Sequence, residues 1–407
     1  MNCRHCAHPL RHVFLDLGFA PPSNAYLSAA DLKAPESYFP LKLFVCEQCW
    51  LVQTEDYSRA DELFRADYAY FSSISKSWLD HAARYVEKVA SRFALGPQSH
   101  VIEVASNDGY LLKNFVAAGT PCLGIEPTDS TAKAAEALGI PVRREFFGKQ
   151  LAERLVAEGR AADLVIGNNV YAHVPDINDF TAGLEAVLKP GGTVTLEFPH
   201  LLNMIGQSQF DTVYHEHYSY LSLYTVSRIF AKAGLRVWDV EQLPTHGGSL
   251  RIYGCRMHDS RETLASVSDL LQLEKAGGLQ QLSVYDSFQR QADAVKNDLL
   301  AFLLEQKKAG RTVVGYGAAA KGNTLLNYAG VKPDLLPAVC DAAPSKQGMF
   351  LPGSHIPVLP PAAIGELRPD IILILPWNIA TEVTAQLAHA REWGGSFAVA
   401  VPNMRIL

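Results

Sequence analysis

The feature that most constrains the fold is a strand–turn–helix–strand pattern in residues 101–127. Residues 101–105 form a short apolar run, a polar turn follows, and residues 110–118 are amphipathic before a second apolar run ends at Glu126. This order is that of a βαβ unit, whose parallel strands are joined by a crossover helix and whose first turn commonly meets a nucleotide. The pattern therefore predicts a Rossmann-like α/β sheet.

The turn of this unit, residues 106–109 (SNDG), differs from a dinucleotide site. A dinucleotide turn carries three spaced glycines, which let a pyrophosphate reach the helix N-terminus. Here there is one glycine, while Glu103 and Asp108 supply acidic groups that suit a ligand with a cationic or neutral end. Glu126 is placed to accept hydrogen bonds from ribose hydroxyls. We therefore expect S-adenosylmethionine; the alternative is an ordinary turn with Asn and Asp caps.

Further apolar runs continue the sheet. They predict strands at 121–126, 140–143, 163–167 and 193–198, and a closing antiparallel hairpin from 236–240 and 249–256. A turn is expected at Lys189-Pro190-Gly191-Gly192. Because helical segments alternate with these strands, the sheet should be mostly parallel.

Polar residues follow the fourth strand, where Asn168, Asn169 and His173 are found. Ligands of open α/β sheets lie beyond the carboxyl ends of the strands, so these side chains should face the same crevice as Glu126. His173 has the alternative role of a histidine that only satisfies the start of a helix. The residues expected to bind the cofactor are Glu103, Ser106, Asn107, Asp108, Gly109, Glu126 and Asn168.

Two CxxC pairs, Cys3/Cys6 and Cys46/Cys49, predict a metal site near the N-terminus. Four thiolates form a closed tetrahedral Zn²⁺ site, which leaves no position for a catalytic water. We therefore expect structural zinc bound by these four cysteines, in preference to a redox dithiol or a catalytic metal. Three nearby histidines could compete as ligands, but the paired spacing favours the cysteines.

Bulk properties limit the possible partners. The chain has 407 residues and a net charge of −6, which suits two or three domains and argues against a strongly basic nucleic-acid surface. No signal pattern and no apolar run of transmembrane length is evident, so we expect a cytoplasmic protein without a membrane or nucleic-acid partner, and a monomer.

Two aromatic and polar segments carry further candidates. Residues 56–66 predict a helix, and residues 67–73 (DYAYFSS) precede a long helix expected at 76–93. The tyrosines and serines of the second segment, Tyr68 among them, could line a polar ligand site. Core aromatics with a capping serine are the alternative.

Residues 210–220 hold the densest cluster of titratable groups. His215 and His217 are two residues apart, so they do not form the four-residue histidine pair of a metalloprotease helix. With a partner to orient it, which could be Tyr214, Glu216 or a carboxylate from elsewhere, His217 would be a general base near neutral pH. A polar loop whose tyrosines pack on the core is the alternative.

The C-terminal part begins with a second Rossmann-like pattern. After a helical connector of two helices at 261–309, residues 312–323 (TVVGYGAAAKGN) form a strand and a glycine-rich turn that opens a helix. This context suits a phosphate, with Gly317 in the turn and Lys321 in the first helical turn. Asp341 ends the next strand. The alternatives are an NAD site and a glycine turn that only packs helix on strand. Strands near 370–375 and 396–401 and a helix at 379–392 complete this α/β unit.

Five motifs in order resemble those of the three-domain sugar C-methyltransferases. They are the two CxxC pairs, EVASNDG at 103–109, GIEP at 124–127, YHEHY at 214–218 and GYGAAAKGN at 315–323. The resemblance implies an α/β chain with a zinc-binding module, a class I methyltransferase core and a C-terminal Rossmann-like domain. We expect these at residues 1–66, 67–260 and 261–407, the last including the connector.

The resemblance also implies a substrate and roles. The substrate would be a 4-keto-6-deoxyhexose linked to dTDP or GDP and methylated most readily at C3. His217 would be the base with Tyr214 and Glu216 beside it. The residues expected to line the sugar and diphosphate site are Tyr68, Asn169, His173, Gly317 and Lys321. The alternatives are methylation at C5, a zinc-ribbon RNA methyltransferase, and a non-enzymatic nucleotide-sugar-binding protein.

Overall fold

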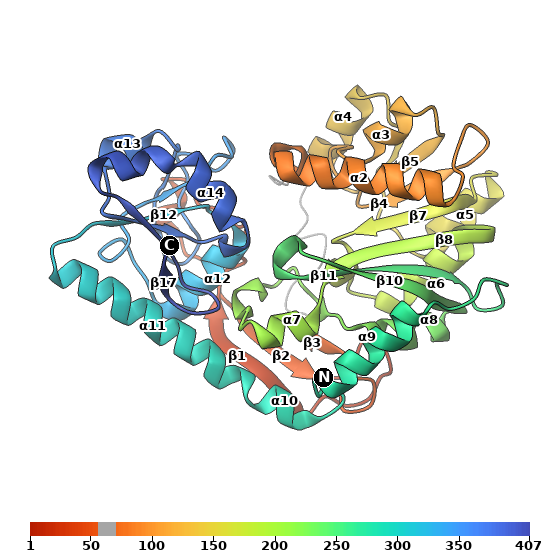
Figure 1. Cartoon of the computed structure of the whole chain (residues 1–407), viewed down its shortest axis with the longest axis horizontal. Coiled ribbons are helices and arrows are strands. Elements are labelled where there is room, and N and C mark those ends of the chain that lie inside the picture. The colour runs from red at the N-terminus through yellow and green to blue at the C-terminus, as the bar shows by residue number, and fades with distance from the viewer. Residues whose placement is uncertain (56–70) are drawn as a thin grey trace.

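The computed structural model describes residues 1–55 and 71–407, so the helix expected at 56–66 and the predicted site residue Tyr68 lie outside the described residues. Within the described ranges the strands form three sheets. Figure 1 shows the C-terminal and central sheets on opposite sides of the molecule, with the N-terminal strands β1 and β2 between their lower ends. No helix in these ranges is long and apolar enough to cross a membrane.

The N-terminal sheet is antiparallel, with strand order β1-β2-β3-β9. Its strands are β1 (His12–Ala20), β2 (Phe39–Val45), β3 (Val52–Thr54) and β9 (Ser219–Tyr220). In β2, Leu41, Leu43 and Val45 are buried and alternate with half-buried residues, as in a strand with one face on a core. Because β9 directly follows the YHEHY motif, this sheet fixes the position of the predicted base.

The central sheet has seven strands in the order β10-β11-β8-β7-β4-β5-β6. They are β4 (Val101–Val104), β5 (Cys122–Ile125), β6 (Val142–Arg143), β7 (Ala162–Asn168), β8 (Leu188–Pro199), β10 (Leu235–Leu243) and β11 (Ser249–Arg256). Strands β4 to β8 are parallel, and β10 and β11 close the sheet antiparallel. The predicted βαβ order and closing hairpin are confirmed.

The predicted turn at residues 189–192 is wrong in one respect. The strand β8 already begins at Leu188, so the four residues 189–192 lie within it. They form an irregularity in the pairing with β7, where the register shifts. Gly191 adopts φ +76°, which lets the chain deviate within the strand without steric cost.

Helices cover both faces of the central sheet. On one face lie α2 (Lys76–Arg92), α3 (Leu112–Ala117) and α4 (Asp129–Ala137), and on the other α5 (Lys149–Ala157), α6 (Ile177–Val187) and α8 (Leu223–Lys232). Successive residues of a strand face opposite helix layers. Val101 packs in the core with α2, α3 and α4, and Ile102 in the core with α5, α6 and α8. This period of two buries the strands on both faces, as in parallel sheets.

The connector contains three helices where two were predicted: α9 (Ala265–Ala276), α10 (Leu282–Asp286) and α11 (Phe288–Lys308). Gly278, at φ +79°, helps to separate the first two. The long helix α11 packs on β1, where the rings of Phe14 and Phe288 stack with centroids 4.7 Å apart. One apolar core therefore joins the N-terminal sheet, the connector and the C-terminal sheet.

The C-terminal sheet has the order β14-β13-β12-β15-β16-β17, parallel except for β17. Its elements are β12 (Val313–Tyr316), α12 (Ala320–Ala329), β13 (Val339–Cys340), β14 (Val358–Leu359), α13 (Ala363–Leu367), β15 (Ile371–Ile374), α14 (Ala380–Gln386), β16 (Ser396–Val399) and β17 (Arg405–Ile406). The predicted Rossmann-like unit is confirmed. The helix expected at 379–392 is shorter, because a separate 3₁₀ helix follows at Ala388–Trp393.

Candidate active site and metal centre

The four cysteines of the CxxC pairs form one buried cluster. All four sulfur atoms lie within 4.8 Å of one another, and the Sγ atoms of Cys3 and Cys49, and of Cys6 and Cys46, are 3.5 Å apart. Thiolates on tetrahedral zinc lie about 3.8 Å apart, so this donor set fits zinc closely. Hydrogen bonds from Cys46 and Cys49 hold the pKa of the Cys3 thiol well below its ordinary value, which supplies a thiolate ligand. The site is structural, because four protein ligands complete the coordination.

Replacing Cys46 with serine is expected to remove the zinc. One of the four ligands is lost, and a site of three thiolates binds zinc far more weakly. Metal analysis should fall from one zinc per chain to near zero, and hydrogen exchange should rise in β2 and β3, which flank the second CxxC pair. The matched control is Cys122→Ser, a buried cysteine outside the cluster, which should keep its zinc. Full zinc in Cys46→Ser would contradict the assignment.

A cavity of about 640 Å³ lies where the central sheet and the C-terminal sheet meet. At one end it is lined by Asn107, Glu126 and Asn168, from the carboxyl ends of the central strands. At the other end it is lined by Lys321 and Lys346 of the C-terminal unit. The wall between them is formed by Asn169, His173, Tyr214, His217 and His246. Residues predicted for the cofactor, for the base and for the diphosphate thus line one cavity.

The cofactor end presents unused polar groups. Neither Oδ1 nor Nδ2 of Asn168 has a hydrogen-bond partner among the described residues, although the side chain is only 8% exposed. Buried polar groups are normally paired, so this amide suits a polar ligand. Glu126 accepts hydrogen bonds from the backbone N–H groups of Asn107 (2.9 Å) and Thr128 (3.0 Å). The Thr128 hydroxyl also donates to this carboxylate at 2.5 Å, so about one of its four acceptor sites stays open to a ribose hydroxyl.

Other residues predicted for the cofactor lie beneath the turn and do not line the cavity. Burial, then the nearby Glu126 and Asp108, raises the pKa of Glu103 well above its ordinary value, which favours the neutral acid. Asp108 accepts a hydrogen bond from the backbone N–H of Ser73 at 3.0 Å. Asn107 similarly accepts from Ser72, so the turn holds the segment that leads into α2.

Ser106 and Gly109 shape the same turn. Gly109 has φ +78°, and a Cβ there would collide with Ile140 and meet Ala135 at 3.2 Å. The Ser106 hydroxyl fills the space where Gly124 lacks a side chain. These residues bring α4 and β5 close to the turn, and their predicted role in binding the cofactor stays a prediction.

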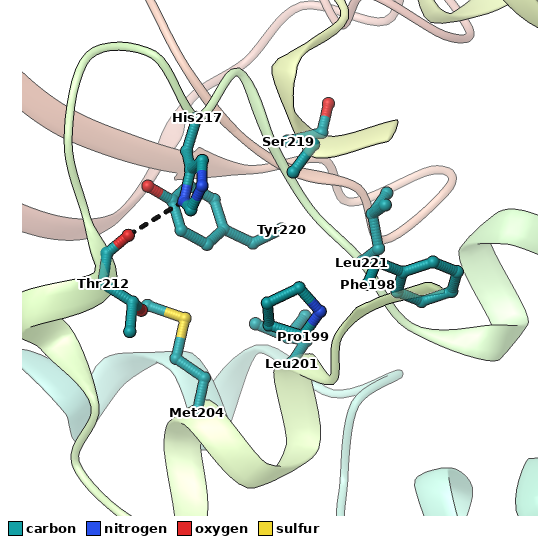
Figure 2. Close-up of a pocket in the computed structure, with 10 residues that line it drawn as sticks. Phe198, Pro199, Leu201, Met204, Thr212, His217, Ser219, Tyr220 and Leu221 are labelled. Atoms are coloured by element: carbon teal, nitrogen blue, oxygen red, sulfur yellow. Dashed lines mark hydrogen bonds between the residues drawn. The ribbon is translucent and has the colours of Figure 1, made fainter. Parts of the chain in front are cut away.

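His217 is buried in the wall of the cavity, with 8% of its surface exposed. Its Nδ1–H donates to the backbone carbonyl of Thr212 at 3.0 Å (Figure 2), which leaves Nε2 as the basic nitrogen. Burial lowers the pKa of His217 well below its ordinary value, so the ring is neutral at physiological pH. A separate cavity of about 20 Å³ also adjoins this ring, with room for about one water. A ligand larger than a water molecule therefore has to reach this ring through the large cavity.

Tyr214 and Glu216 take different positions around His217. The rings of Tyr214 and His217 are 3.9 Å apart between centroids, so the tyrosine packs directly on the imidazole. Glu216 points away and accepts a hydrogen bond from Asn24 at 3.2 Å, while its backbone carbonyl accepts from His173. The Thr212 carbonyl, and not the Glu216 carboxylate, therefore orients His217, because the chain turns sharply within the motif.

Burial of Glu216 makes the stability of the folded protein depend on pH. Burial raises its pKa from 4.5 to about 7, so between these values only the unfolded chain releases the proton. The free energy of unfolding thus falls as the pH rises from 4.5 to about 7. At higher pH the total loss is about 3 kcal/mol. Glu216→Gln should be about 3 kcal/mol more stable than wild type at pH 8 and unchanged at pH 4.

Urea unfolding at the two pH values checks this prediction. The control is Glu87→Gln, an exposed residue of α2, which should leave the difference between the two pH values as in wild type. Equal stability of Glu216→Gln and wild type at pH 8 would show that Glu216 is not held protonated.

The C-terminal end of the cavity gathers cationic groups. Lys321 Nζ donates to Asn378 at 2.6 Å and lies 4.8 Å from the ring centroid of Trp377. The indole of Trp377 donates to buried Asp211 at 2.7 Å, and burial raises the pKa of Asp211 to about 6. Lys346 lies nearby and donates to the Ala318 carbonyl at 2.7 Å. Two lysines and the N-terminus of α12 can attract an anion.

Gly317 and Asp341 determine the backbone conformation of the turn after β12, at the C-terminal end of the cavity. Gly317 has φ +89°, and a Cβ there would collide with Pro376, so glycine permits the turn. Asp341, which follows β13, accepts hydrogen bonds from the backbone N–H groups of Ala318 (2.7 Å) and Ala343 (2.8 Å). This carboxylate stabilises the turn.

Several residues of the cavity were missed from the sequence. Asn24 comes from the segment between β1 and β2, which crosses to the C-terminal unit, where Tyr26 donates to the Ala318 carbonyl at 2.5 Å. His246 lies in the loop of the predicted hairpin, and Asp211, which contacts Trp377 beside the cavity, lies within the predicted cluster at 210–220. A histidine beside two glycines was the available signal for His246; nothing in the sequence marks Asn24.

Comparison with protein families agrees with this architecture. A model described as a zinc binding domain matches residues 3–64, a methyltransferase domain matches residues 78–240, and a C-methyltransferase C-terminal domain matches residues 244–402. With the α/β core and its cavity, these matches define an S-adenosylmethionine-dependent methyltransferase with a structural zinc site.

C-methyltransferase NovU from Streptomyces niveus is 32% identical over 406 residues, covering 100% of this chain and 96% of that protein. The chain belongs to the family of three-domain sugar C-methyltransferases. The ubiquinone biosynthesis O-methyltransferase of Methylobacterium sp. (strain 4-46) is 26% identical over 149 residues, 30% of this chain and 59% of that protein. Among solved structures, a methyltransferase from Clostridium acetobutylicum ATCC 824 has 12% identity and a TM-score of 0.36, covering 48% of this chain and 94% of that one.

Proposed function

We propose that the protein methylates C3 of a 4-keto-6-deoxyhexose linked to dTDP or GDP, through an enolate formed by a base. The observation that carries the proposal is the single cavity shared by Asn168, His217 and Lys321. Along its length the cavity offers a polar end for the cofactor, then a neutral base, then a cationic end. A methyl donor, a sugar and a diphosphate would need the same order. Residues 1–66, 67–260 and 261–407 are the proposed domains that supply these parts.

The reaction follows from the acidity that a ketone gives to its neighbours. His217 Nε2 removes the C3 proton, and the electron pair of the broken C–H bond forms the enolate with negative charge on the C4 oxygen. S-adenosylmethionine supplies an electrophilic methyl group. Attack of C3 on that methyl group would form the C3–methyl bond, break the sulfur–methyl bond and restore the C4 ketone. The proton on His217 then leaves to solvent.

The other lining residues hold the reactants. Glu126 and Asn168 would bind the ribose and a polar group of the methyl donor. Asn169 and His173 would contact the sugar, with Tyr214 against the base. Lys321, together with the turn at Gly317, would bind the diphosphate at the N-terminus of α12.

A labelled methyl-transfer assay tests this function. The purified protein would be incubated with methyl-labelled S-adenosylmethionine and a panel of dTDP- and GDP-linked 4-keto-6-deoxyhexoses. We expect label in at least one nucleotide sugar and none in the corresponding 4-hydroxy sugars, which cannot form the enolate. Protein that binds the methyl donor but labels none of the 4-keto sugars would contradict the proposal.

A further inference from the structure

Three histidines, His173, His217 and His246, line the large cavity, and their hydrogen bonds fix which ring nitrogen carries the hydrogen. A backbone carbonyl only accepts, so Nδ1 must be protonated both in His217, which contacts the Thr212 carbonyl, and in His173, which contacts the Glu216 carbonyl at 2.8 Å. In their neutral forms both rings therefore have a lone pair on Nε2. Such rings can accept a proton, but Nε2 cannot donate a hydrogen bond.

His246 has the opposite arrangement. Its Nε2 lies 3.1 Å from the side-chain Nδ2 of Asn169, and an amide nitrogen only donates. Nε2 of His246 therefore accepts, and the hydrogen of the neutral ring is on Nδ1. No residue in the described part of the chain forms a hydrogen bond with this Nδ1. His246 is thus the histidine of the cavity that offers an N–H from its unused nitrogen.

The ring of His246 is held firmly and stays neutral. Its backbone is left-handed, at φ +53°, and its ring meets Trp78 edge to face with centroids 5.2 Å apart. The loop is anchored by Thr245, which donates to Glu197 at 2.9 Å, and by Gly247, where a Cβ would collide with Trp377. Burial and then the charge of Lys321 lower the pKa of His246 to about 4.

We propose that His246 is a catalytic residue that donates its Nδ1–H to the C4 oxygen of the sugar, where negative charge develops as His217 removes the C3 proton. This role rests on the proposed function and adds a donor for the enolate oxygen. No proton is transferred; the hydrogen bond shortens as the charge grows and relaxes when the ketone returns. A rigid donor aimed at such an oxygen contributes mainly in the transition state.

Two variants separate the two nitrogens. Asparagine places its amide near the position of Nδ1, whereas glutamine reaches the position of Nε2. His246→Gln keeps an acceptor for Asn169 but lacks the donor, so kcat and the rate of C3 proton exchange into deuterated water should fall about 10²- to 10³-fold, with KM changed little. His246→Asn loses the contact with Asn169 but keeps the donor, so both rates should fall only about tenfold.

The tautomer itself is measured without substrate. In protein labelled with ¹⁵N-histidine, the NMR signals that vanish in His246→Gln should report a neutral ring protonated on Nδ1. Protonation on Nε2, or proton exchange by His246→Gln at the wild-type rate, would overturn this role while leaving the proposed function intact. If wild-type protein exchanged no proton of any 4-keto nucleotide sugar, the proposed function would fail and this role with it.

Discussion

Replacing His217 with asparagine is expected to lower kcat up to about 10⁴-fold, the range contributed by a general base. The asparagine amide can still donate to the Thr212 carbonyl that holds the imidazole, but it has no basic nitrogen at the position of Nε2. Exchange of the sugar C3 proton into deuterated water should therefore disappear together with methyl transfer. Steady-state kinetics and proton NMR of the recovered sugar measure the two effects.

The matched control lies two residues away in the same motif. His215 points out of the cavity, and its Nε2 contacts the Phe39 carbonyl at 3.4 Å. His215→Asn should keep kcat within about threefold of wild type, because no interaction with the reacting atoms is removed. Retained C3 exchange in His217→Asn would remove His217 as the base, even if methyl transfer were lost.

The second large effect is expected from Lys321→Met. Lys321 lies at the cationic end of the cavity, fixed by Asn378 and the face of Trp377. Removing one partner of a buried charge pair costs about 3 to 5 kcal/mol, so KM for the nucleotide sugar should rise at least about a hundredfold. The dissociation constant of S-adenosylmethionine should not change, because the proposed site for the methyl donor is at the other end of the cavity.

Calorimetric titration of each ligand and steady-state kinetics measure this separation. Lys133→Met, an exposed lysine of α4, is the control and should leave both constants unchanged. An unchanged KM for the nucleotide sugar in Lys321→Met would move the diphosphate away from this turn. Weakened binding of the methyl donor would instead indicate that the variant disturbs the whole cavity.

The sequence predicted the parts of the fold that depend on local patterns. Short apolar runs located the central strands, because strands buried on both faces need apolar residues throughout. The rule that ligands lie beyond the strand ends correctly brought Asn168, Asn169 and His173 to one cavity with Glu126. Paired spacing identified the four cysteines of the zinc cluster.

Contacts between distant segments could not be predicted in this way. Glu216 and His217 are adjacent in sequence, yet one points to Asn24 and the other into the cavity, and only the path of the backbone decides this. The pairing of β9 with β3 joins residues about 165 positions apart by a short run of backbone hydrogen bonds without a sequence signature. The left-handed backbone of His246 is likewise set by packing around its loop.

The proposed reaction methylates a carbon beside the 4-keto group of a nucleotide sugar. The most direct test uses S-adenosylmethionine with a ¹³C-labelled methyl group and a dTDP-linked 4-keto-6-deoxyhexose, with the labelled methyl located by NMR correlation to the sugar carbons. We expect a methyl on C3, adjacent to the carbonyl at C4. A methyl on a sugar oxygen would contradict the enolate mechanism, and a methyl on C5 would contradict the predicted position.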